Sequence, residues 1–317
     1  MIRIGYACIN IELKSRGIYS TRTITIGQLK KRPDDAKKIA LLNIDDLGKM
    51  IEHNESLGIR FFRITSNLFP HLGNPKTPAY TIDFARKELA RVGKIARELG
   101  HRITMHPGQY AQLGSTRPEV VKQTTIDLTN HADIFVAMGM TPTLGSVMII
   151  HGGGTFGDKV ETLKRFRENF LKLPEYVRKF VSLENDEWSY SVMDLLPVCE
   201  DMNIPLCPDF FHHAIGHADQ FDIYDHAVMS RIISTWTRRG IKPKCHLSEQ
   251  RPGERKGAHS DCVSEIPRRL IDVAIEYGID IMLEVKHKDT CVISIYEKYF
   301  TQVNNGNRVE WYLHLFK

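Results

Sequence analysis

The chain has 317 residues, of which 42% are hydrophobic and 26% charged, so it can bury a sizeable core in one large α/β barrel or in two ordinary domains. Its net charge of +5 suits an anionic partner such as nucleic acid, but many enzymes that act on small molecules are as basic. No apolar run approaches the ~18 residues of a membrane span, and the N-terminus shows no signal-peptide pattern, so we expect a soluble, cytoplasmic protein without membrane contact.

Eight short apolar, strand-like runs alternate with amphipathic stretches along most of the chain. The runs are RIGYACI (3–9), RFFRI (60–64), RITMH (102–106), SVMIIH (146–151), FVSLEN (180–185), PLCPDF (205–210), PKCHL (243–247) and DIMLEV (280–285). Between them, apolar residues recur with helical spacing over residues 83–100, where Gly100 supplies the stop. A second helical pattern covers residues 264–278, with Pro267 in its first turn and Gly278 after its end.

Eight units of strand and helix in succession predict an α/β fold in which a parallel sheet closes into a single (β/α)8, or TIM, barrel. A doubly wound open sheet is the rival fold, but the chain has no glycine-rich dinucleotide turn. No linker marks a second domain, so we expect one barrel over residues 1–300 and a tail of unknown role over 301–317. The irregular stretches 11–35 and 212–222 fall where the active-face loops of such a barrel lie. Six scattered cysteines without a C-x-x-C pair predict free thiols in a reducing compartment.

A histidine, aspartate or glutamate stands at or near the end of six successive predicted strands. These residues are His106, His151, Glu184, Asp209, His246 and Glu284, and two more histidines, His212 and His259, follow closely. Because the C-terminal ends of barrel strands meet at one mouth, we expect these side chains to converge there. Each one alone is an ordinary loop, capping or salt-bridge residue, but together they predict a metal cluster. Eight nitrogen and carboxylate ligands exceed what one ion needs and suit two or three ions of zinc, manganese or iron.

Lys244 is expected inside the barrel, because strand alternation points it the same way as His246 and points Cys245 toward the helices. A buried ammonium beside cations is costly, so three states stay open: a neutral amine, a lysine paired with a carboxylate, or a lysine modified to carry negative charge. Clustered ions at such a mouth suit either phosphodiester hydrolysis or a metal-assisted aldose–ketose isomerisation.

The loop MHPGQYAQL (105–113), which follows the third predicted strand, carries two large side chains. Its Pro-Gly turn is tight, so Gln109 and Tyr110 project at the mouth. Proteins that act on nucleotides within a duplex insert such side chains where a base has been extruded. The alternative is that Tyr110 packs on a neighbouring loop. Further residues of the predicted rim are Tyr6 and Asn10, with the basic residues Lys14, Arg16, Arg22, Arg251, Arg255 and Lys256 as phosphate contacts.

A set of motifs lies on nearly every predicted strand. The motifs are NIDDLGKMIEHN (43–54), FRITSNLFPH (62–71), MHPGQYAQLGS (105–115), IHGGGTFGDK (150–159), SLEND (182–186), PDFFHH (208–213), KCHLS (244–248), AHSD (258–261) and MLEVKHK (282–288). Together they resemble the UV damage endonuclease family, whose barrel is similar to that of the abasic-site nuclease endonuclease IV. The likeness covers about residues 1–298 and is far more specific than any single pattern.

The resemblance implies a TIM barrel that holds a cluster of two or three divalent ions, with Mn²⁺ the first expectation and Zn²⁺, Co²⁺ or Mg²⁺ as alternatives. It implies incision of double-stranded DNA immediately 5′ of UV photoproducts, namely cyclobutane pyrimidine dimers and 6-4 photoproducts. The lesion bases would be flipped out, and the cut would leave a 3′-hydroxyl and a 5′-phosphate. We expect no organic cofactor, a monomer, and association with the nucleoid if the source is prokaryotic.

Carried over by position, the metal ligands of the family correspond to His106, His151, Glu184, Asp209, His212, His246, His259 and Glu284. Within PDFFHH either His212 or His213 could be the ligand, and the three-residue spacing from Asp209 favours His212. Lys244 matches a lysine that carries a carboxyl group in the family. The expected catalytic set is Glu184, Glu284 and Lys244.

The resemblance also assigns the residues that would contact a lesion. Gln109 and Tyr110 match the pair that fills the space left by the flipped lesion bases. Tyr6 and Asn10 correspond to residues on the opposite side of that space, and His71 aligns with a histidine near the site.

Two alternative functions remain for the same barrel. One is an abasic-site endonuclease of the endonuclease IV type, which would cut abasic DNA and leave photoproducts alone. The other is a metal-dependent sugar isomerase, which would need a closed small-molecule pocket and would show no affinity for DNA.

Overall fold

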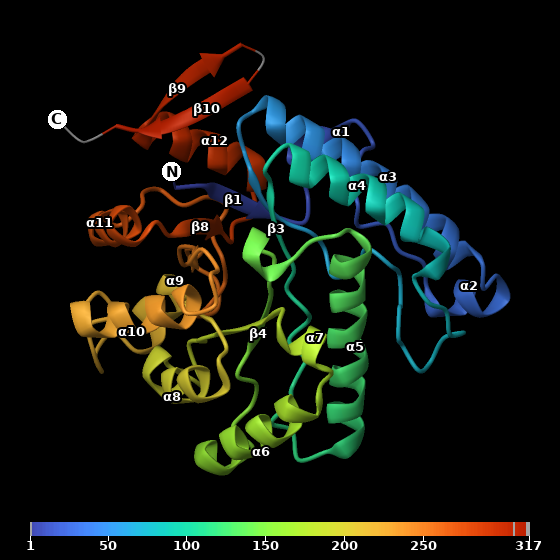
Figure 1. Ribbon diagram of the computed structural model, residues 1–317, viewed down its shortest axis with the longest axis horizontal. Helices are drawn as coiled ribbons and strands as arrows, with labels where there is room; N and C mark the ends of the chain where they lie inside the picture. Colours follow the sequence, from blue (N-terminus) through green and yellow to red (C-terminus); the bar gives the residue numbers. More distant parts are fainter. Residues whose placement is uncertain (1, 307, 315–317) are drawn as a thin grey trace.

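The computed structural model describes residues 2–306 and 308–314 and places eight parallel strands at its centre (Figure 1). The strands are β1 (Ile4–Ala7), β2 (Phe61–Arg63), β3 (Arg102–Thr104), β4 (Met148–His151), β5 (Val181–Glu184), β6 (Leu206–Cys207), β7 (Lys244–Leu247) and β8 (Asp280–Leu283). Each strand lies within one of the eight runs predicted from the sequence, so that prediction is confirmed. The strands are shorter than the runs because the ends of the runs pass into loops.

The eight strands close on themselves in chain order. Hydrogen-bonded ladders join β3-β2-β1-β8-β7 and β4-β5-β6. Single parallel bridges, Met105 with Met148 and Asp209 with His246, connect β3 to β4 and β6 to β7. The prediction of a TIM barrel is therefore confirmed, and the rival open sheet is excluded.

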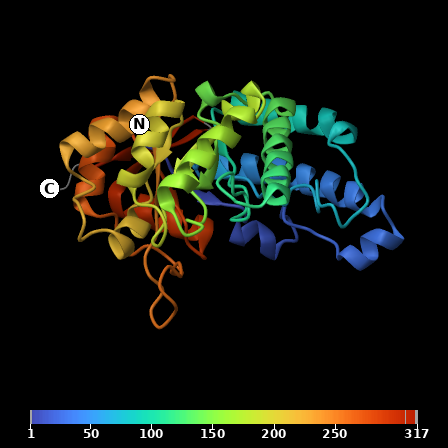
Figure 2. The same cartoon turned by 90° about the horizontal axis from the view of Figure 1, so that it is seen from below.

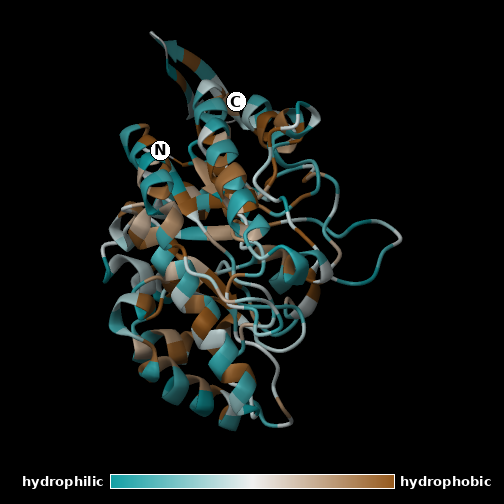
Figure 3. Ribbon diagram, turned by 90° about the vertical axis from the view of Figure 1, so that its right-hand side faces the viewer, coloured by the Kyte–Doolittle hydropathy of each residue, from teal (hydrophilic) through white to brown (hydrophobic). Residues whose placement is uncertain are grey.

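Helices form the outer layer around the strands (Figures 1 and 2). They are α1 (Ile11–Ser15), α2 (Ile26–Lys31), α3 (Asp35–Ser56), α4 (Arg86–Glu98), α5 (Pro118–Ala137), α6 (Lys159–Lys172), α7 (Glu175–Arg178), α8 (Val192–Met202), α9 (Phe210–Gly216), α10 (His226–Thr237), α11 (Arg268–Tyr277) and α12 (Lys288–Tyr299), with short 3-10 turns η1 (Asp83–Ala85) and η2 (Pro142–Leu144). Their hydrophilic and hydrophobic residues alternate along each helix, as the colours of Figure 3 show. Throughout the described ranges, no helix has both the length and the apolar character needed to cross a membrane.

Two details of the predicted helices need correction. Pro267 is the N-cap of α11 rather than a residue of its first turn, because the helix begins at Arg268 and not at the start of the predicted pattern, Ser264. Gly278 ends that helix as predicted, in a left-handed conformation with a φ of 68°. The stretches 11–35 and 212–222, expected to be irregular, contain α1, α2 and much of α9, since short capped helices leave little periodic signal.

A buried ion pair lies at the N-terminal end of the barrel, where strands β3 and β8 begin. Arg102 is 1% exposed and Asp280 is fully buried, and their charged atoms lie 3.0 Å apart. Arg102 also donates to the carbonyl oxygens of Gly145 and Lys242, which leaves its guanidinium well paired. The opposite end of the barrel, where the strands finish, carries the predicted ligands.

The C-terminal residues form an antiparallel hairpin, β9 (Phe300–Asn305) and β10 (Arg308–Leu313). Trp311 anchors the hairpin: its ring stacks on that of Tyr296 at 5.0 Å, and its Nε1 donates to the carbonyl oxygen of Leu57. The predicted tail over 301–317 is thus packed against α3 and α12 through residue 314, while residues 307 and 315–317 lie outside the described residues. Its role stays unassigned.

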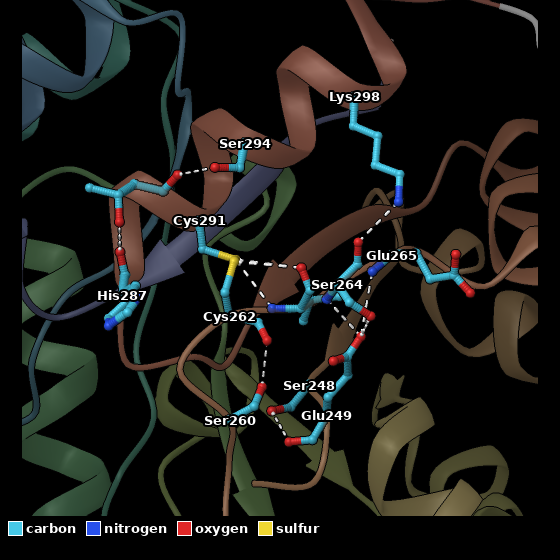
Figure 4. Close-up of a disulfide and its surroundings, with 12 residues drawn as sticks. Ser248, Glu249, Ser260, Cys262, Ser264, Glu265, His287, Cys291, Ser294 and Lys298 are labelled. Atoms are coloured by element: carbon cyan, nitrogen blue, oxygen red, sulfur yellow. Dashed lines mark hydrogen bonds between the residues drawn. A yellow bond between two sulfur atoms is a disulfide. The ribbon is translucent and has the colours of Figure 1, made fainter. Parts of the chain in front are cut away.

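The prediction that all six cysteines are free is wrong for one pair. A disulfide joins Cys262, in the loop after β7, to Cys291 near the start of α12 (Figure 4). The two residues are 29 positions apart in sequence, so only the packing of α12 beside that loop brings them together. The cysteines that stay free are Cys8, Cys199, Cys207 and Cys245.

Candidate metal centre

The strand ends bring seven of the eight predicted ligands into three overlapping groups. Within each group, the possible ligand atoms all lie within 4.8 Å of one another. The groups are His106, His151 and Glu184; Glu184, Asp209 and His212; and Glu184, His246 and Glu284. Glu184 belongs to all three and is fully buried, so it stands at the middle of the cluster.

His259, the eighth predicted ligand, lies at the border of the cluster. Its Nδ1 is 3.7 Å from Oε2 of Glu284, and its ring centre is 5.9 Å from that of His212. It is therefore next to two members of the cluster, although it belongs to none of the three close groups.

Local backbone structure explains the Asp-x-x-His spacing of the second group. Asp209 is the N-cap of α9, and its Oδ1 accepts a hydrogen bond from the backbone N–H of His212 at 2.8 Å. The cap places His212 in the first turn of the helix with its ring above the same strand ends. The side-chain amide of Asn185 holds the backbone of Asp209 in place: it donates to the C=O of Asp209 and accepts from its N–H.

His213 points away from the cluster. Its ring lies 4.7 Å from the ring of Phe221, whereas Nε2 of His212 lies 3.8 Å from Oδ2 of Asp209. Between the two histidines that the sequence left open, the geometry therefore favours His212.

The ligand atoms are spaced for cations between them. Nε2 of His151 is 3.9 Å from Oε2 of Glu184, and Nδ1 of His246 is 3.3 Å from Oε1 of Glu284. Ligands at ~2.1 Å from a common tetrahedral ion would stand at roughly such separations. Oδ2 of Asp209 and Nδ1 of His151 are buried and have no hydrogen-bond partner within the described ranges. The nitrogen and carboxylate donors thus fit divalent ions of the zinc and manganese type.

Protons on two imidazoles, those of His212 and His246, balance part of the negative charge within the cluster. Burial disfavours ionisation of Glu184, but His246 and His151 outweigh it and hold its pKa well below the ordinary value. Burial also acts against a charge on His212, yet Asp209 and Glu187 raise its pKa to about 10. Cations that bind at these atoms must displace those protons, so binding should be coupled to proton release.

Lys244 is fully buried and faces the cluster, as alternation predicts. Its Nζ contacts Nε2 of His246 and lies 3.3 Å from Sγ of Cys207. Among the residues that the structure describes, no carboxylate lies within ion-pair distance of this amine, so the lysine–carboxylate pair left open by the sequence is not formed. The neutral and the modified states both remain compatible with the site.

Two residues of the centre were not predicted from the sequence. Arg63, the last residue of β2, pairs with Glu284 and is largely buried. Oε2 of Glu187 lies 2.9 Å from Nδ1 of His212, within ion-pair distance. Arg63 could have been found, because reading strand ends in the second run gives a charged residue at the same level as the ligands. Glu187 lies in a loop, where no sequence signal marked it.

The predicted lesion contacts divide into two kinds. Gln109 and Tyr110 are exposed in the loop after β3, and 80% of Tyr110 is accessible, so Tyr110 does not pack on a neighbouring loop. Tyr6 and Asn10 are fully buried. The Tyr6 hydroxyl donates to Asn54 at 2.6 Å and accepts from Asn10, which also caps α1. Neither side chain is exposed at the rim in the absence of DNA, and the assignment of Tyr6 and Asn10 as lesion contacts stays a prediction.

His71 lies outside the three ligand groups. Its Nε2 is 2.6 Å from the carbonyl oxygen of Ile24. Together with Tyr110 it lines a hollow of about 790 Å³ beside the loop after β3. The structure thus places His71 next to the predicted probe rather than among the ligands.

The whole chain is similar to one family of known proteins. The sequence profile of the family described as UV-endonuclease UvdE matches residues 2–311. A protein of Acanthamoeba polyphaga mimivirus is 46% identical over 305 residues, which cover 95% of this chain and 92% of its own. The UV-damage endonuclease of Schizosaccharomyces pombe is 39% identical over 312 residues and 95% of this chain, and the chain spans 51% of that relative's length.

Solved structures agree with these sequence relatives. SacUVDE matches with a TM-score of 0.80 and 34% identity, over 92% of this chain and 96% of its own. Endonuclease IV from Thermus thermophilus has a TM-score of 0.55 at 15% identity, over 80% of this chain and 92% of its own, a likeness that shows the barrel fold alone. From its matched profile, its relatives and its ligand-bearing barrel, the chain belongs to the UV-endonuclease UvdE family.

Proposed function

We propose that this protein is a metal-dependent DNA endonuclease that cuts the phosphodiester immediately 5′ of UV photoproducts and leaves a 3′-hydroxyl and a 5′-phosphate. The observation that carries the proposal is the sharing of Glu184 by three groups of metal-type ligands at one mouth of the barrel. The name of the fungal relative, UV-damage endonuclease, supports the choice of damaged DNA as the substrate.

We infer two or three divalent ions, because the donors divide into three groups that share one carboxylate. Mn²⁺ suits the mixed nitrogen and oxygen donors, and Zn²⁺, Co²⁺ and Mg²⁺ are the alternatives. Such ions, when bound, activate water and neutralise charge on the attacking and leaving oxygens of the phosphodiester.

Neighbouring residues of the protein hold the candidate ligands in position and keep the carboxylates among them ionised. His106 and His246 hydrogen-bond to the two oxygens of Glu184 and keep it ionised. Arg63 holds Glu284 in its charged form at the other side of the cluster. Lys244, beside His246 and carboxylated in this proposal, would add a further anionic ligand. All of these groups come from one chain, so a monomer suffices. Action on DNA implies an intracellular place of work, cytoplasmic or at the nucleoid.

Selectivity for photoproducts would come from the cost of extruding bases. A pyrimidine dimer stacks and pairs poorly, so flipping it out costs less than flipping normal bases. Gln109 and Tyr110, exposed in the loop that starts at the ligand His106, are placed to fill the space that the flipped bases leave. On this proposal they hold the flipped state open beside the ions.

Replacing both Gln109 and Tyr110 by alanine should weaken binding to a photodimer duplex by about tenfold or more, because stacking contributes about 1–3 kcal/mol per base. Metal content, measured by elemental analysis, should stay unchanged. Tyr312→Ala, on the exposed hairpin strand β10, is the matched control and should bind normally. Loss of the metals from the double variant would mean that the pair is structural and would contradict its role as a probe.

One assay separates the proposed function from the two alternatives. The protein is incubated with Mn²⁺ and a duplex oligonucleotide that carries a single photodimer, and the cut is mapped. We expect one cut immediately 5′ of the dimer, with a 3′-hydroxyl. Cutting of an abasic duplex alone would favour the endonuclease IV type of activity. Turnover of ketoses without any affinity for DNA would favour a sugar isomerase.

A further inference from the structure

A second large aromatic side chain stands on the rim of the barrel mouth, in the loop after β5. Trp188 is 68% exposed and lies four residues beyond Glu184, the carboxylate shared by the ligand groups. The other tryptophans are buried, with 0% of Trp236 and 7% of Trp311 accessible. A single exposed aromatic side chain is common on protein surfaces, so the contacts around Trp188 decide whether it is a candidate binding residue.

Trp188 is held on a defined turn. The Oδ1 of Asp186 accepts hydrogen bonds from the backbone N–H groups of Trp188, at 2.7 Å, and of Ser189. The backbone of Asp186 is itself bonded to Tyr190 and accepts from Nε2 of His217. The backbone position of the indole is therefore set by the fold, which lowers the entropy lost when the ring binds something.

The same turn is connected to the metal centre and to a basic loop. Glu187, the residue before Trp188, lies 2.9 Å from Nδ1 of the candidate ligand His212. A Cβ at Gly257, in the loop after β7, would lie 2.3 Å from Oε1 of Glu187, so that loop packs tightly on the turn. Nζ of Lys256, from the same loop, lies 4.7 Å from the centre of the Trp188 ring. The turn that carries the indole therefore contacts both the candidate ligand His212 and a cationic segment.

The loop that supplies Lys256 projects from the body of the molecule, as the orange segment near residue 255 in Figure 2. Within the described part of the chain, Lys256 and Arg255 have no carboxylate within ion-pair distance, whereas Arg251 pairs with Asp261 at 3.5 Å. An exposed indole with one unpaired cation beside it and a second on the same loop matches the two parts of a nucleotide, its base and its phosphate.

We propose that Trp188 stacks on an unpaired nucleobase of the bound DNA while Lys256 and Arg255 contact the neighbouring phosphates. The inference rests on the proposed function, since it assumes DNA at this mouth. Trp188 follows β5 and Tyr110 follows β3, so the loop after β4, which begins at His151, lies between the two aromatic side chains.

The intrinsic fluorescence of the protein can test the stacking directly, because Trp188 alone among the tryptophans is accessible. Zinc-loaded protein is titrated with a single-stranded oligothymidylate, since paramagnetic manganese would itself quench emission. We expect saturable quenching in the natural protein and its loss in Trp188→Phe. Quenching that persists in Trp188→Phe would come from Trp236 or Trp311 and would overturn the proposal.

Incision kinetics on the photodimer duplex provide the second test. Trp188→Ala should raise KM by about tenfold or more and change kcat little, whereas Trp188→Phe should restore most of the loss, because any aromatic face can stack. Tyr176→Ala is the matched control, since Tyr176 is 39% exposed on α7, which precedes β5. It should leave both constants unchanged.

The outcomes distinguish this inference from the proposed function. If the natural protein is quenched by oligothymidylate but leaves photodimers uncut, the proposed function fails and the stacking residue stands. If photodimers are cut and Trp188→Ala matches the natural protein in KM, the assignment of Trp188 alone is overturned.

Discussion

Glu184→Ala is expected to remove nearly all incision of photodimer DNA, by about three orders of magnitude or more. Glu184 contacts His106 and His246 through both carboxylate oxygens and belongs to every ligand group of the cluster. A thousandfold loss corresponds to ~4 kcal/mol of transition-state stabilisation, and removal of the one carboxylate that all three ligand groups share should cost at least that much. Elemental analysis should show the loss of at least one bound ion.

The matched control for this change is Glu98→Gln, an exposed carboxylate on α4 whose contact with Lys94 is 3.7 Å long. It should leave incision and metal content as they are. Thermal unfolding of both variants, measured without metal, separates a lost ligand from a lost fold. A correctly folded Glu184→Ala protein that still cuts normally would contradict the central place assigned to this residue.

The barrel was predictable from the sequence because its signal is local. Each strand is a short apolar run, and residues such as Gly100 and Gly278 stop the helices between them. The closure of the sheet into a barrel was also predictable, because eight successive strand–helix units can form a closed sheet without edge strands. Helix starts such as that of α11 were less well placed, because several residues near Pro267 can serve as a cap.

The convergence of the candidate ligands was predictable because barrel topology brings strand ends together, whatever the distance between them in sequence. Residues that act through a tertiary contact were not. Nothing near Glu187 in sequence indicates His212, and nothing near Cys262 indicates Cys291. The side-chain direction of Tyr6 is likewise a tertiary property: its hydroxyl bonds to Asn54 on α3, a contact that its place in the first predicted strand does not reveal.

Arg63 offers the strongest test of how the cluster is stabilised before ions bind. Its guanidinium pairs with Glu284, and the partners are only 14% and 9% exposed. Burial acts against a charge on Glu284, but Arg63 and His246 outweigh it and hold its pKa well below the ordinary value. Arg63→Met keeps the length of the side chain and removes its charge, so Glu284 would be left buried with less positive charge around it.

We expect Arg63→Met to lower the free energy of unfolding of the metal-free protein by about 3–5 kcal/mol, the usual effect of breaking a buried ion pair. In the Mn²⁺-loaded protein the loss should be clearly smaller, because a cation close to Glu284 replaces part of the missing charge. Urea unfolding with chelator and with Mn²⁺ measures both values. Arg60→Met is the control: its partner Glu55, at 2.6 Å, is not among the cluster ligands, so its loss should not depend on metal.

The stability difference between the natural protein and Arg63→Met should also depend on pH, which tests separately whether Arg63 acts through the charge of Glu284. The lowered pKa of Glu284 stabilises the fold at pH values above the unfolded value of about 4.3, and this contribution disappears as the pH falls through the folded pKa. The gap in unfolding free energy between the natural protein and Arg63→Met should therefore be largest near neutral pH, and it should shrink as the pH falls and Glu284 of the variant takes up its proton. A gap that stays constant with pH, or one that metal does not reduce, would mean that Arg63 acts by packing and that Glu284 does not depend on its charge.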